Sequence, residues 1–250
     1  MARSSRSRDH RVQMTRSVEP EWLDVLPADD PRAQRSRRDL RRVNALMANA
    51  GIVAGELRRA ALPPHATLAE IGAGDGAFAV RLARALPPAA GSTPFALLDR
   101  QSIVEPATVA TLAARGWAAL AIRDDVFAWL SGAGASRDAI VANLFLHHFD
   151  TAELARLLAL IAARTRCFVA CEPRRSGVAL AGSRLLGLVG CNDVTRHDAV
   201  ASVRAGFRDG EIAALWPRDA GWTLEEGARG LFSHCFVARR APHVPLPGGT

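Results

Sequence analysis

A turn built from alternating glycines follows an apolar run in the stretch LAEIGAGDGAF, residues 68–78. Gly72, Gly74 and Gly76 stand where a helix should begin, and glycine both accepts a positive φ and lets a ligand approach the bare backbone. The first turn of that helix also offers free N–H groups to an anionic group. Glu70 and Asp75 add two carboxylates. The stretch therefore predicts a ligand-binding turn with negatively charged surroundings.

Two classes of cofactor fit a turn of this kind. A nicotinamide dinucleotide binds to G-x-G-x-x-A, which Gly72, Gly74 and Ala77 satisfy. S-adenosylmethionine binds to an acidic residue followed by G-x-G-x-G, which begins here with Glu70. Carboxylates are unfavourable beside a pyrophosphate, whereas they suit a ligand with sulfonium and ammonium groups. The chain has no Lys and no Tyr, which excludes the Tyr-x-x-x-Lys pair of short-chain dehydrogenases.

Acidic residues also follow the next two apolar runs. Asp99 ends the second run, where its carboxylate could accept hydrogen bonds from the ribose hydroxyls of either cofactor. Asp125 follows the third run, where it could accept the adenine amino group while the Val126 N–H donates to the adenine ring. Asp124 is an alternative to Asp125, and a helix N-cap is an alternative role for Asp125.

The apolar runs that carry these residues alternate with helical patterns. Such alternation is typical of a parallel sheet covered by helices on both faces, so we expect an α/β fold. The expected strands are 67–71, 95–98, 117–122, 138–144 and 167–171, and the expected helices are 76–86, 102–115, 125–132 and 151–165. Two later runs, 221–226 and 231–239, are joined by GARG and predict a strand pair.

The segments outside this pattern predict a tail, a cap and a lid. The first 18 residues hold five Arg and one Asp, a composition typical of disorder, and either Met1 or Met14 could be the start. The predicted division is a disordered basic tail at 1–18, a helical cap at 19–65, a main domain at 66–240 with a lid insertion at 173–210, and a flexible tail at 241–250.

Composition also bears on the location of the protein, on metal binding and on its partners. No apolar stretch reaches the roughly 18 residues of a membrane span, and the first residues lack the apolar region of a secretory signal, so we expect a cytoplasmic protein. The four Cys lack the spacing of a metal site or of a disulfide framework, so no metal is expected. The net charge is +7, of which the tail carries five Arg less one Asp, or +4. No nucleic-acid partner is expected for the remainder.

Four segments in register, EIGAGDGAF, LLDR, RDDVFAWL and DAIVANLFLHHF, resemble the class I S-adenosylmethionine-dependent methyltransferases. The resemblance covers residues 66–172, and the final strand pair is similar to the antiparallel seventh strand of that family. It implies a Rossmann-like, seven-stranded, mostly parallel sheet and S-adenosylmethionine as cofactor. The implied cofactor-binding residues are Glu70, Gly72, Gly74 and Gly76 at the methionine moiety, Asp99 at the ribose with Arg100 beside it, Asp125 and Val126 at the adenine, and Asn143 in the fourth segment.

The fourth segment bears on the methyl acceptor. Methyltransferases that act on exocyclic amines of nucleic-acid bases carry an Asn/Asp-Pro-Pro-aromatic run here, whereas Asn143 is followed by LFLHHF. That ending resembles small-molecule methyltransferases of quinone and polyketide pathways in bacteria. The expected reaction is therefore O- or C-methylation of a small aromatic metabolite. An RNA-directed methyltransferase, a non-catalytic cofactor-binding scaffold and an NAD(H)-dependent protein are the alternatives.

Two adjacent histidines, His147 and His148, are the candidate bases. Neighbouring side chains of an extended backbone point to opposite faces, so only one of the two is expected to face the site. A histidine packed under the sheet or capping the following helix is the alternative. The candidate substrate contacts are His197, Arg204 and Phe207 in the insertion and Glu172 at the end of the fifth apolar run.

Overall fold

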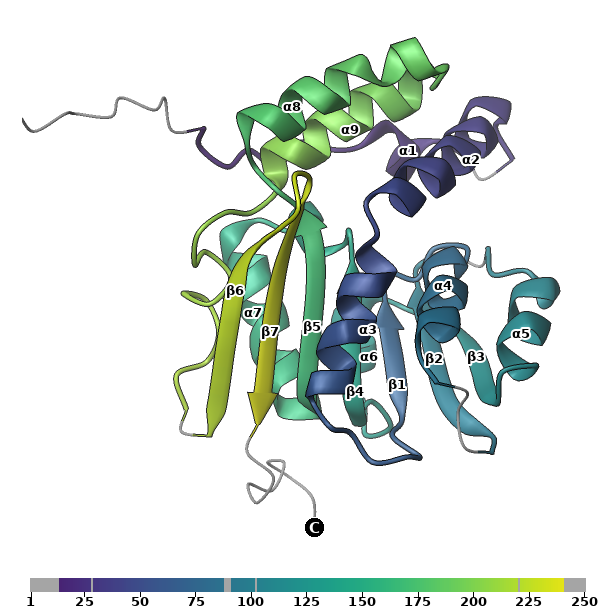
Figure 1. Ribbon diagram of the computed structural model, residues 1–250, viewed down its shortest axis with the longest axis vertical. Helices are drawn as coiled ribbons and strands as arrows, with labels where there is room; N and C mark the ends of the chain where they lie inside the picture. Colours follow the sequence, from purple (N-terminus) through teal and green to yellow (C-terminus); the bar gives the residue numbers. More distant parts are fainter. Residues whose placement is uncertain (1–13, 28, 88–90, 102, 220, 241–250) are drawn as a thin grey trace, which may run out of the picture.

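A seven-stranded sheet carries the fold in the computed structural model, which describes residues 14–27, 29–87, 91–101, 103–219 and 221–240 (Figure 1). Its strands are β1 (Leu68–Ile71), β2 (Thr93–Asp99), β3 (Trp117–Arg123), β4 (Arg137–Asn143), β5 (Thr165–Pro173), β6 (Trp222–Arg229) and β7 (Ser233–Arg240). The strand order is β3-β2-β1-β4-β5-β7-β6. β1 to β5 pair in parallel, and β7 runs antiparallel between β5 and β6. The predicted fold class is confirmed.

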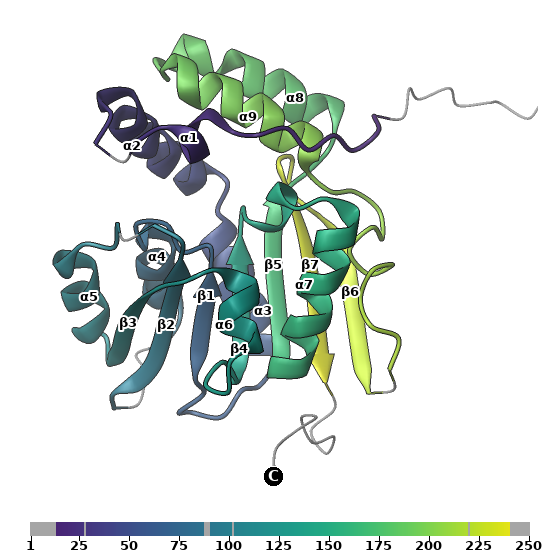
Figure 2. The same cartoon turned by 180° about the vertical axis from the view of Figure 1, so that it is seen from behind.

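Helices cover both faces of this sheet (Figures 1 and 2). One face carries α3 (Asn49–Arg59), α4 (Ala77–Ala85) and α5 (Pro106–Ala113), and the other carries α6 (Val126–Ser131) and α7 (Thr151–Arg164). Every residue of β1 is buried, as expected for a strand with helices above and below it. α5 begins at Pro106, later than expected, because proline fits the first position of a helix.

A helical layer lies above the carboxyl ends of the parallel strands (Figure 1). It consists of α1 (Trp22–Val25) and α2 (Pro31–Leu46) from the cap, and of α8 (Gly177–Arg184), the 3-10 helix η2 (Leu185–Val189) and α9 (Asp193–Ala205) from the insertion. The insertion is therefore helical and lies over the edge where the site is expected. The cap forms separate helices because Ala48 adopts a left-handed φ of 56° between α2 and α3.

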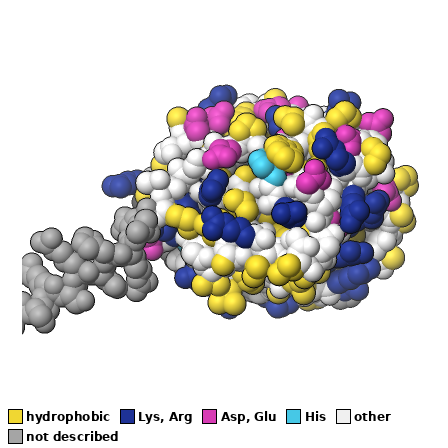
Figure 3. All heavy atoms as spheres, turned by 90° about the horizontal axis from the view of Figure 1, so that it is seen from above, with side chains coloured by type: hydrophobic (Ala, Val, Ile, Leu, Met, Phe, Trp, Pro, Cys, Tyr) yellow, Lys and Arg dark blue, Asp and Glu magenta, His cyan; other side chains and the backbone are white. Residues whose placement is uncertain are grey.

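The two parts of the layer are joined by hydrogen bonds. Asp198 on α9 accepts from the backbone N–H groups of Trp22 and Leu23 at 2.8 and 3.0 Å, and Asp39 on α2 accepts from Asn192 N–H at 2.9 Å. Seen from above, acidic, basic and apolar side chains are interspersed over this layer (Figure 3). No helix of the described residues is long and apolar enough to cross a membrane.

The predicted disordered tail is wrong for residues 14–18. Arg16 donates hydrogen bonds to the carbonyls of Ala205 and Phe149, both at 2.8 Å, and its guanidinium lies 4.6 Å from the centre of the Phe207 ring. Met14 accepts a hydrogen bond from Arg175 through its carbonyl. These partners are more than 100 residues away in sequence, so local composition could not reveal them. The rest of the predicted tail, 1–13, and the predicted C-terminal tail, 241–250, lie outside the described residues.

Candidate active site

The glycine turn joins β1 to α4 and has the geometry that its sequence predicts. Gly72, Gly74 and Gly76 adopt φ angles of 70°, 56° and 76°. A Cβ on Gly72 would lie 2.2 Å from the Phe145 ring, and one on Gly76 would lie 2.7 Å from Thr108. A Cβ on Gly74 would meet none of the described residues within 4 Å. Close packing therefore requires glycine at positions 72 and 76. At position 74 the absence of a side chain leaves the backbone accessible from a cleft.

Asp99 ties the end of β2 to this turn. Its carboxylate accepts hydrogen bonds from Gly74 N–H and Gln101 N–H, both at 2.8 Å. Asp99, the residue predicted to bind the ribose, thus also stabilises the glycine turn.

Glu70 lies directly below the turn and is only 1% exposed. Its Oε2 atom has no hydrogen-bond partner among the described residues. Burial, reinforced by the nearby charges of Asp75 and Asp99, holds the pKa of Glu70 well above its usual value. A buried carboxylate oxygen without a partner is costly. A cationic group in the cleft would give it one.

Two adjoining clefts, of about 500 and 250 Å³, open above the turn and share part of their lining. The larger cleft is lined by Gly72, Asp99, Arg100, Asp125 and Val126, and the smaller by Glu70, Gly72, Gly74, Asp99 and Asn143. The structure thus brings together every predicted cofactor-binding residue except Gly76, which lines neither cleft and begins α4 behind them. The set spans the carboxyl ends of four neighbouring parallel strands, where open α/β sheets bind their ligands.

Asp125 has the capping role that was the alternative reading of its position. Its carboxylate accepts from Phe127 N–H and Ala128 N–H at the start of α6, at 2.9 and 3.2 Å. It also lines the larger cleft together with Asp124, so both remain placed to contact a ligand.

Asn143 is held by a buried chain of polar groups that the sequence did not indicate. Its side-chain oxygen accepts from Asn49 at 2.8 Å, and Asn49 accepts from the Ser233 hydroxyl at 2.6 Å. Asn49 lies at the start of α3 and Ser233 at the start of β7, so a cap helix and the last strand jointly orient a residue of the cleft.

The prediction that His147 and His148 point to opposite faces is wrong. The chain leaves β4 and forms a short 3-10 helix, η1 (Leu146–His148), so the side-chain alternation of extended backbone does not apply. Both residues line the smaller cleft, and their ring centroids are 4.2 Å apart.

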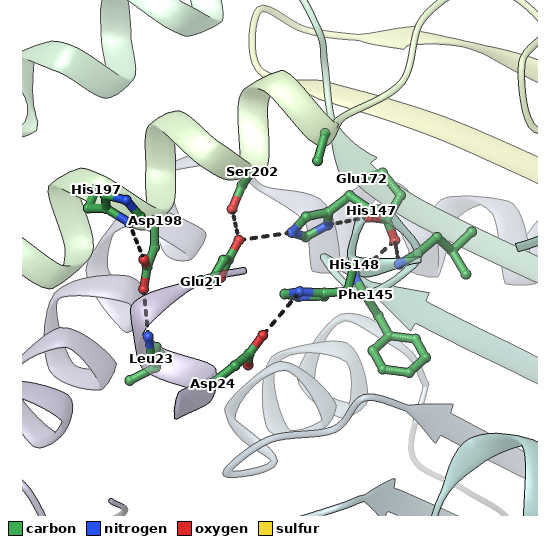
Figure 4. A network of polar contacts seen from close by, with 12 residues as sticks. Glu21, Leu23, Asp24, Phe145, His147, His148, Glu172, His197, Asp198 and Ser202 are labelled. Atoms are coloured by element: carbon green, nitrogen blue, oxygen red, sulfur yellow. Dashed lines mark hydrogen bonds and ion pairs between the residues drawn. The ribbon is translucent and has the colours of Figure 1, made fainter. Parts of the chain in front are cut away.

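His147 is held between two carboxylates (Figure 4). Its Nδ1 lies 2.8 Å from Glu172 Oε2, and its Nε2 lies 3.3 Å from Glu21 Oε1. Burial alone would lower the pKa of His147, but the hydrogen bonds to Glu172 and Glu21 raise it to about 9. Burial likewise opposes ionisation of Glu21, yet the hydrogen bond to His147 lowers the pKa of Glu21 to about 2. At neutral pH the two form an ion pair.

Glu172 and Ser202 complete this network. Glu172 is fully buried, and its Oε1 accepts from Phe145 N–H and Leu146 N–H at 3.0 and 2.9 Å. Ser202 on α9 donates to Glu21. The strand end, the insertion and the cap therefore meet at His147.

His148 lies on the open side of this network. It lines both clefts, its side chain is 28% exposed, and its Nδ1 lies 3.4 Å from Asp24 Oδ2 (Figure 4). Of the two candidate bases, His148 is the one that a ligand could reach. The sequence did not point to Asp24 or Glu21, because both come from an acid-rich segment that looks like a loop.

The predicted substrate contacts of the insertion lie elsewhere. His197 stacks on Trp22 with ring centroids 4.0 Å apart. It also pairs with Asp198 (Figure 4). His197 and Arg204 line a separate concavity, and Phe207 is buried in the core. The structure does not bring these three residues to the two clefts.

Comparisons with known proteins bear on the fold. No family model and no curated protein matches the chain in sequence. Among solved structures, an O-methyltransferase family protein from Burkholderia thailandensis aligns with TM-score 0.58 at 18% identity, over 87% of this chain and 62% of that one. A putative O-methyltransferase from Nostoc punctiforme aligns with TM-score 0.58 at 16% identity, over 90% and 64%. The chain has the methyltransferase fold.

A third methyltransferase-fold structure is covered almost along its whole length. It is a plantazolicin methyltransferase in complex with a monoazolic substrate analogue and SAH, with TM-score 0.59 at 13% identity, over 85% of this chain and 91% of that one. The first two neighbours are longer, and this chain spans less than two thirds of each.

Proposed function

We propose that this chain is an S-adenosylmethionine-dependent methyltransferase that acts on a small hydroxylated aromatic acceptor. The observation that supports this cofactor is the environment of Glu70. Its buried carboxylate oxygen has no partner among the described residues and lies beside the accessible backbone of Gly74. When bound, S-adenosylmethionine supplies a methyl group on a sulfonium, together with an ammonium group. Both of these charges suit a site lined by carboxylates.

The residues of the two clefts fit the cofactor part by part. In this proposal Glu70, Gly74 and Asn143 hold the methionine end in the smaller cleft, and Asp99 holds the ribose where the clefts meet. Asp125, with Asp124 as its competitor, and Val126 hold the adenine in the larger cleft. The carboxylates of Glu70 and Asp75 at the glycine turn would disfavour a pyrophosphate, which argues against NAD(H).

The acceptor end of the larger cleft combines apolar and polar groups. Phe145 and Phe149 pack edge to face, with ring centroids 5.1 Å apart, and line the cleft with His148 and Asp24. We assign the aromatic side chains to the acceptor ring and His148 to its hydroxyl. His148 accepts the hydroxyl proton while Asp24 stabilises the resulting imidazolium. The deprotonated oxygen would then attack the methyl carbon, and the carbon–oxygen bond would form as the sulfur–methyl bond breaks, leaving the demethylated cofactor as a neutral thioether.

Two further observations support a small acceptor. A cleft of about 500 Å³ lies within the range of small-molecule sites. The helical layer above it mixes acidic with basic side chains, unlike the continuous basic surface that binds RNA (Figure 3). The structural neighbours of the chain include O-methyltransferases and a methyltransferase solved with a substrate analogue.

Calorimetric binding of S-adenosylmethionine and of its demethylated product tests the proposal. Wild-type binding should weaken by about 1–3 kcal/mol in Asp99→Ala, because a hydrogen-bonding carboxylate is lost. Asp219→Ala is the matched control, since Asp219 is an exposed carboxylate that pairs with Arg240 away from the clefts. Absence of binding by the wild type, or preference for NAD(H), would overturn the assignment. Binding without turnover on any hydroxylated aromatic would instead favour a non-catalytic scaffold.

A further inference from the structure

A cluster of metal-ligating groups lies at the end of the smaller cleft. Glu21, His147 and His148 each offer one ligand atom, and these three atoms lie within 4.8 Å of one another. The cluster joins two distant parts of the chain, the start of α1 and η1. None of its members is among the residues assigned to the cofactor. Imidazole nitrogen and carboxylate oxygen are the ligands that Zn²⁺ and similar ions accept.

His147 has a carboxylate partner on one ring nitrogen, as histidines that bind metals usually have. Histidines that bind metals usually donate their other ring N–H to a carboxylate, which fixes the ring. Here Glu172 lies 2.8 Å from Nδ1 of His147, and Glu172 is itself held by hydrogen bonds from two backbone N–H groups. His147 is 3% exposed and turns Nε2 toward Glu21, so the ring is oriented before any ligand arrives (Figure 4).

The second histidine brings a further carboxylate. Asp24 lies 3.4 Å from His148 Nδ1 and borders both clefts. Glu21, Asp24 and Glu172 thus present three carboxylates to the two adjacent histidine rings of η1. A divalent cation at this cluster would offset part of that negative charge.

We propose that Glu21, His147 and His148 bind a divalent transition-metal ion of the Zn²⁺ type, and that the ion displaces to solvent the proton that lies between His147 Nε2 and Glu21. Ligands about 2.1 Å from a tetrahedral ion lie roughly 3.4 Å apart, so the three atoms need to close by about 1.4 Å at most. Rotation of the partly exposed His148 and Glu21 side chains supplies such a shift. The fourth position faces the cleft, where Asp24 or an acceptor oxygen would fill it. His148 can act as a base only in the metal-free chain, so its two roles belong to two different states of the same site.

The test is a metal titration of the full-length, untagged chain after treatment with a chelator. Zn²⁺ followed by calorimetry, and Co²⁺ followed by its visible absorption, should each show one ion per chain. Glu21→Gln and His148→Gln should each weaken binding by about tenfold or more. His65→Gln, at an exposed histidine before β1, is the matched control and should leave binding unchanged.

Two outcomes would overturn the proposal: no stoichiometric binding, or binding that both variants leave unaltered. X-ray absorption of the wild-type zinc complex needs no variant and gives an independent answer. Two imidazole ligands support the site, whereas a sulfur ligand would place the ion at a cysteine instead. Cofactor binding is measured separately, so failure of the metal site and failure of the methyltransferase assignment are distinguishable.

Discussion

At the scale of single residues, Glu70 opposes folding and favours ligand binding at the same time. The sheet buries it to 1% exposure, yet one of its oxygens has no partner among the described residues. Taking a charged carboxylate out of water is unfavourable, so Glu70 lowers the stability of the ligand-free chain. When this carboxylate is ionised, the missing partner strengthens its attraction for a cation in the cleft.

Glu70→Gln should therefore stabilise the ligand-free chain, and more so at high pH. The pKa of Glu70 is raised by folding, so the folded chain holds this proton more tightly than the unfolded chain does. The stabilisation that this proton gives is complete at pH values below the pKa of Glu70 in the unfolded chain. It is lost as the pH rises through the pKa of Glu70 in the folded chain. We expect the variant to melt above the wild type at pH 8 and close to it at pH 5.

The same variant should bind S-adenosylmethionine about tenfold more weakly, since it lacks the charge. Thermal unfolding at the two pH values and calorimetry measure both effects. Glu105→Gln is the control, because Glu105 is exposed and makes no side-chain cap bond to α5. A difference in melting temperature that is equal at pH 5 and pH 8 would contradict the burial of a titrating Glu70.

At the scale of elements, Asp125 begins α6 and borders the larger cleft, and two substitutions separate these roles. Asp125→Ala should lose about 1 kcal/mol of unfolding free energy with the cap, and also lose cofactor affinity. Asp125→Asn keeps a good N-cap and should lose affinity alone. Urea unfolding and calorimetry give the two quantities.

Asp150→Ala is the matched control for Asp125. Asp150 caps α7 with a capping box and lines neither cleft, so its loss should reduce stability without reducing affinity. Equal affinity of the wild type and Asp125→Asn would remove Asp125 from the adenine site and favour Asp124.

The elements themselves were largely predictable from sequence. Strands β1, β4 and β5 are continuous apolar runs because both of their faces are buried, and each was expected within two residues of its observed bounds. The glycine turn was predictable because its φ angles admit little else. The His147–His148 pair was not, since a 3-10 helix replaces extended backbone there.

Contacts between distant segments could not be predicted. Glu21 meets His147 across 126 residues, and Asn49 meets Asn143 across 94. A single sequence holds no local signal for such pairs, because the fold alone brings them together. The positions of His197 and Arg204 were missed for the same reason, since their surroundings depend on how α9 docks against the cap.

At the scale of the whole molecule, residues 14–25 form a strap that runs across the carboxyl edge of the sheet and joins the insertion to the cap. Arg16 holds one end through hydrogen bonds to Ala205 and Phe149, and Asp198 holds the other through the N–H groups of α1. The strap covers one side of both clefts, which Glu19, Glu21 and Asp24 help to line.

Arg16→Ala should destabilise the chain by about 1–3 kcal/mol, because it removes charge-assisted hydrogen bonds to backbone carbonyls and a cation–π contact. Chemical denaturation measures the loss. Arg32→Ala, whose side chain is 55% exposed, should change the unfolding free energy by less than about 0.5 kcal/mol. If the two variants proved equally stable, residues 14–18 would not contribute to the fold.

The contrast between Gly72 and Gly74 has an evolutionary consequence. Asparagine tolerates the left-handed backbone of both positions, but at Gly72 its side chain would strike the Phe145 ring whether or not a ligand is bound. At Gly74 a Cβ would meet none of the described residues within 4 Å, so the main obstacle there would be a bound ligand. In a descendant that no longer binds a cofactor, position 74 could therefore change while position 72 stayed glycine. A substitution at position 74 alone would then identify a protein that keeps the fold but has lost cofactor binding.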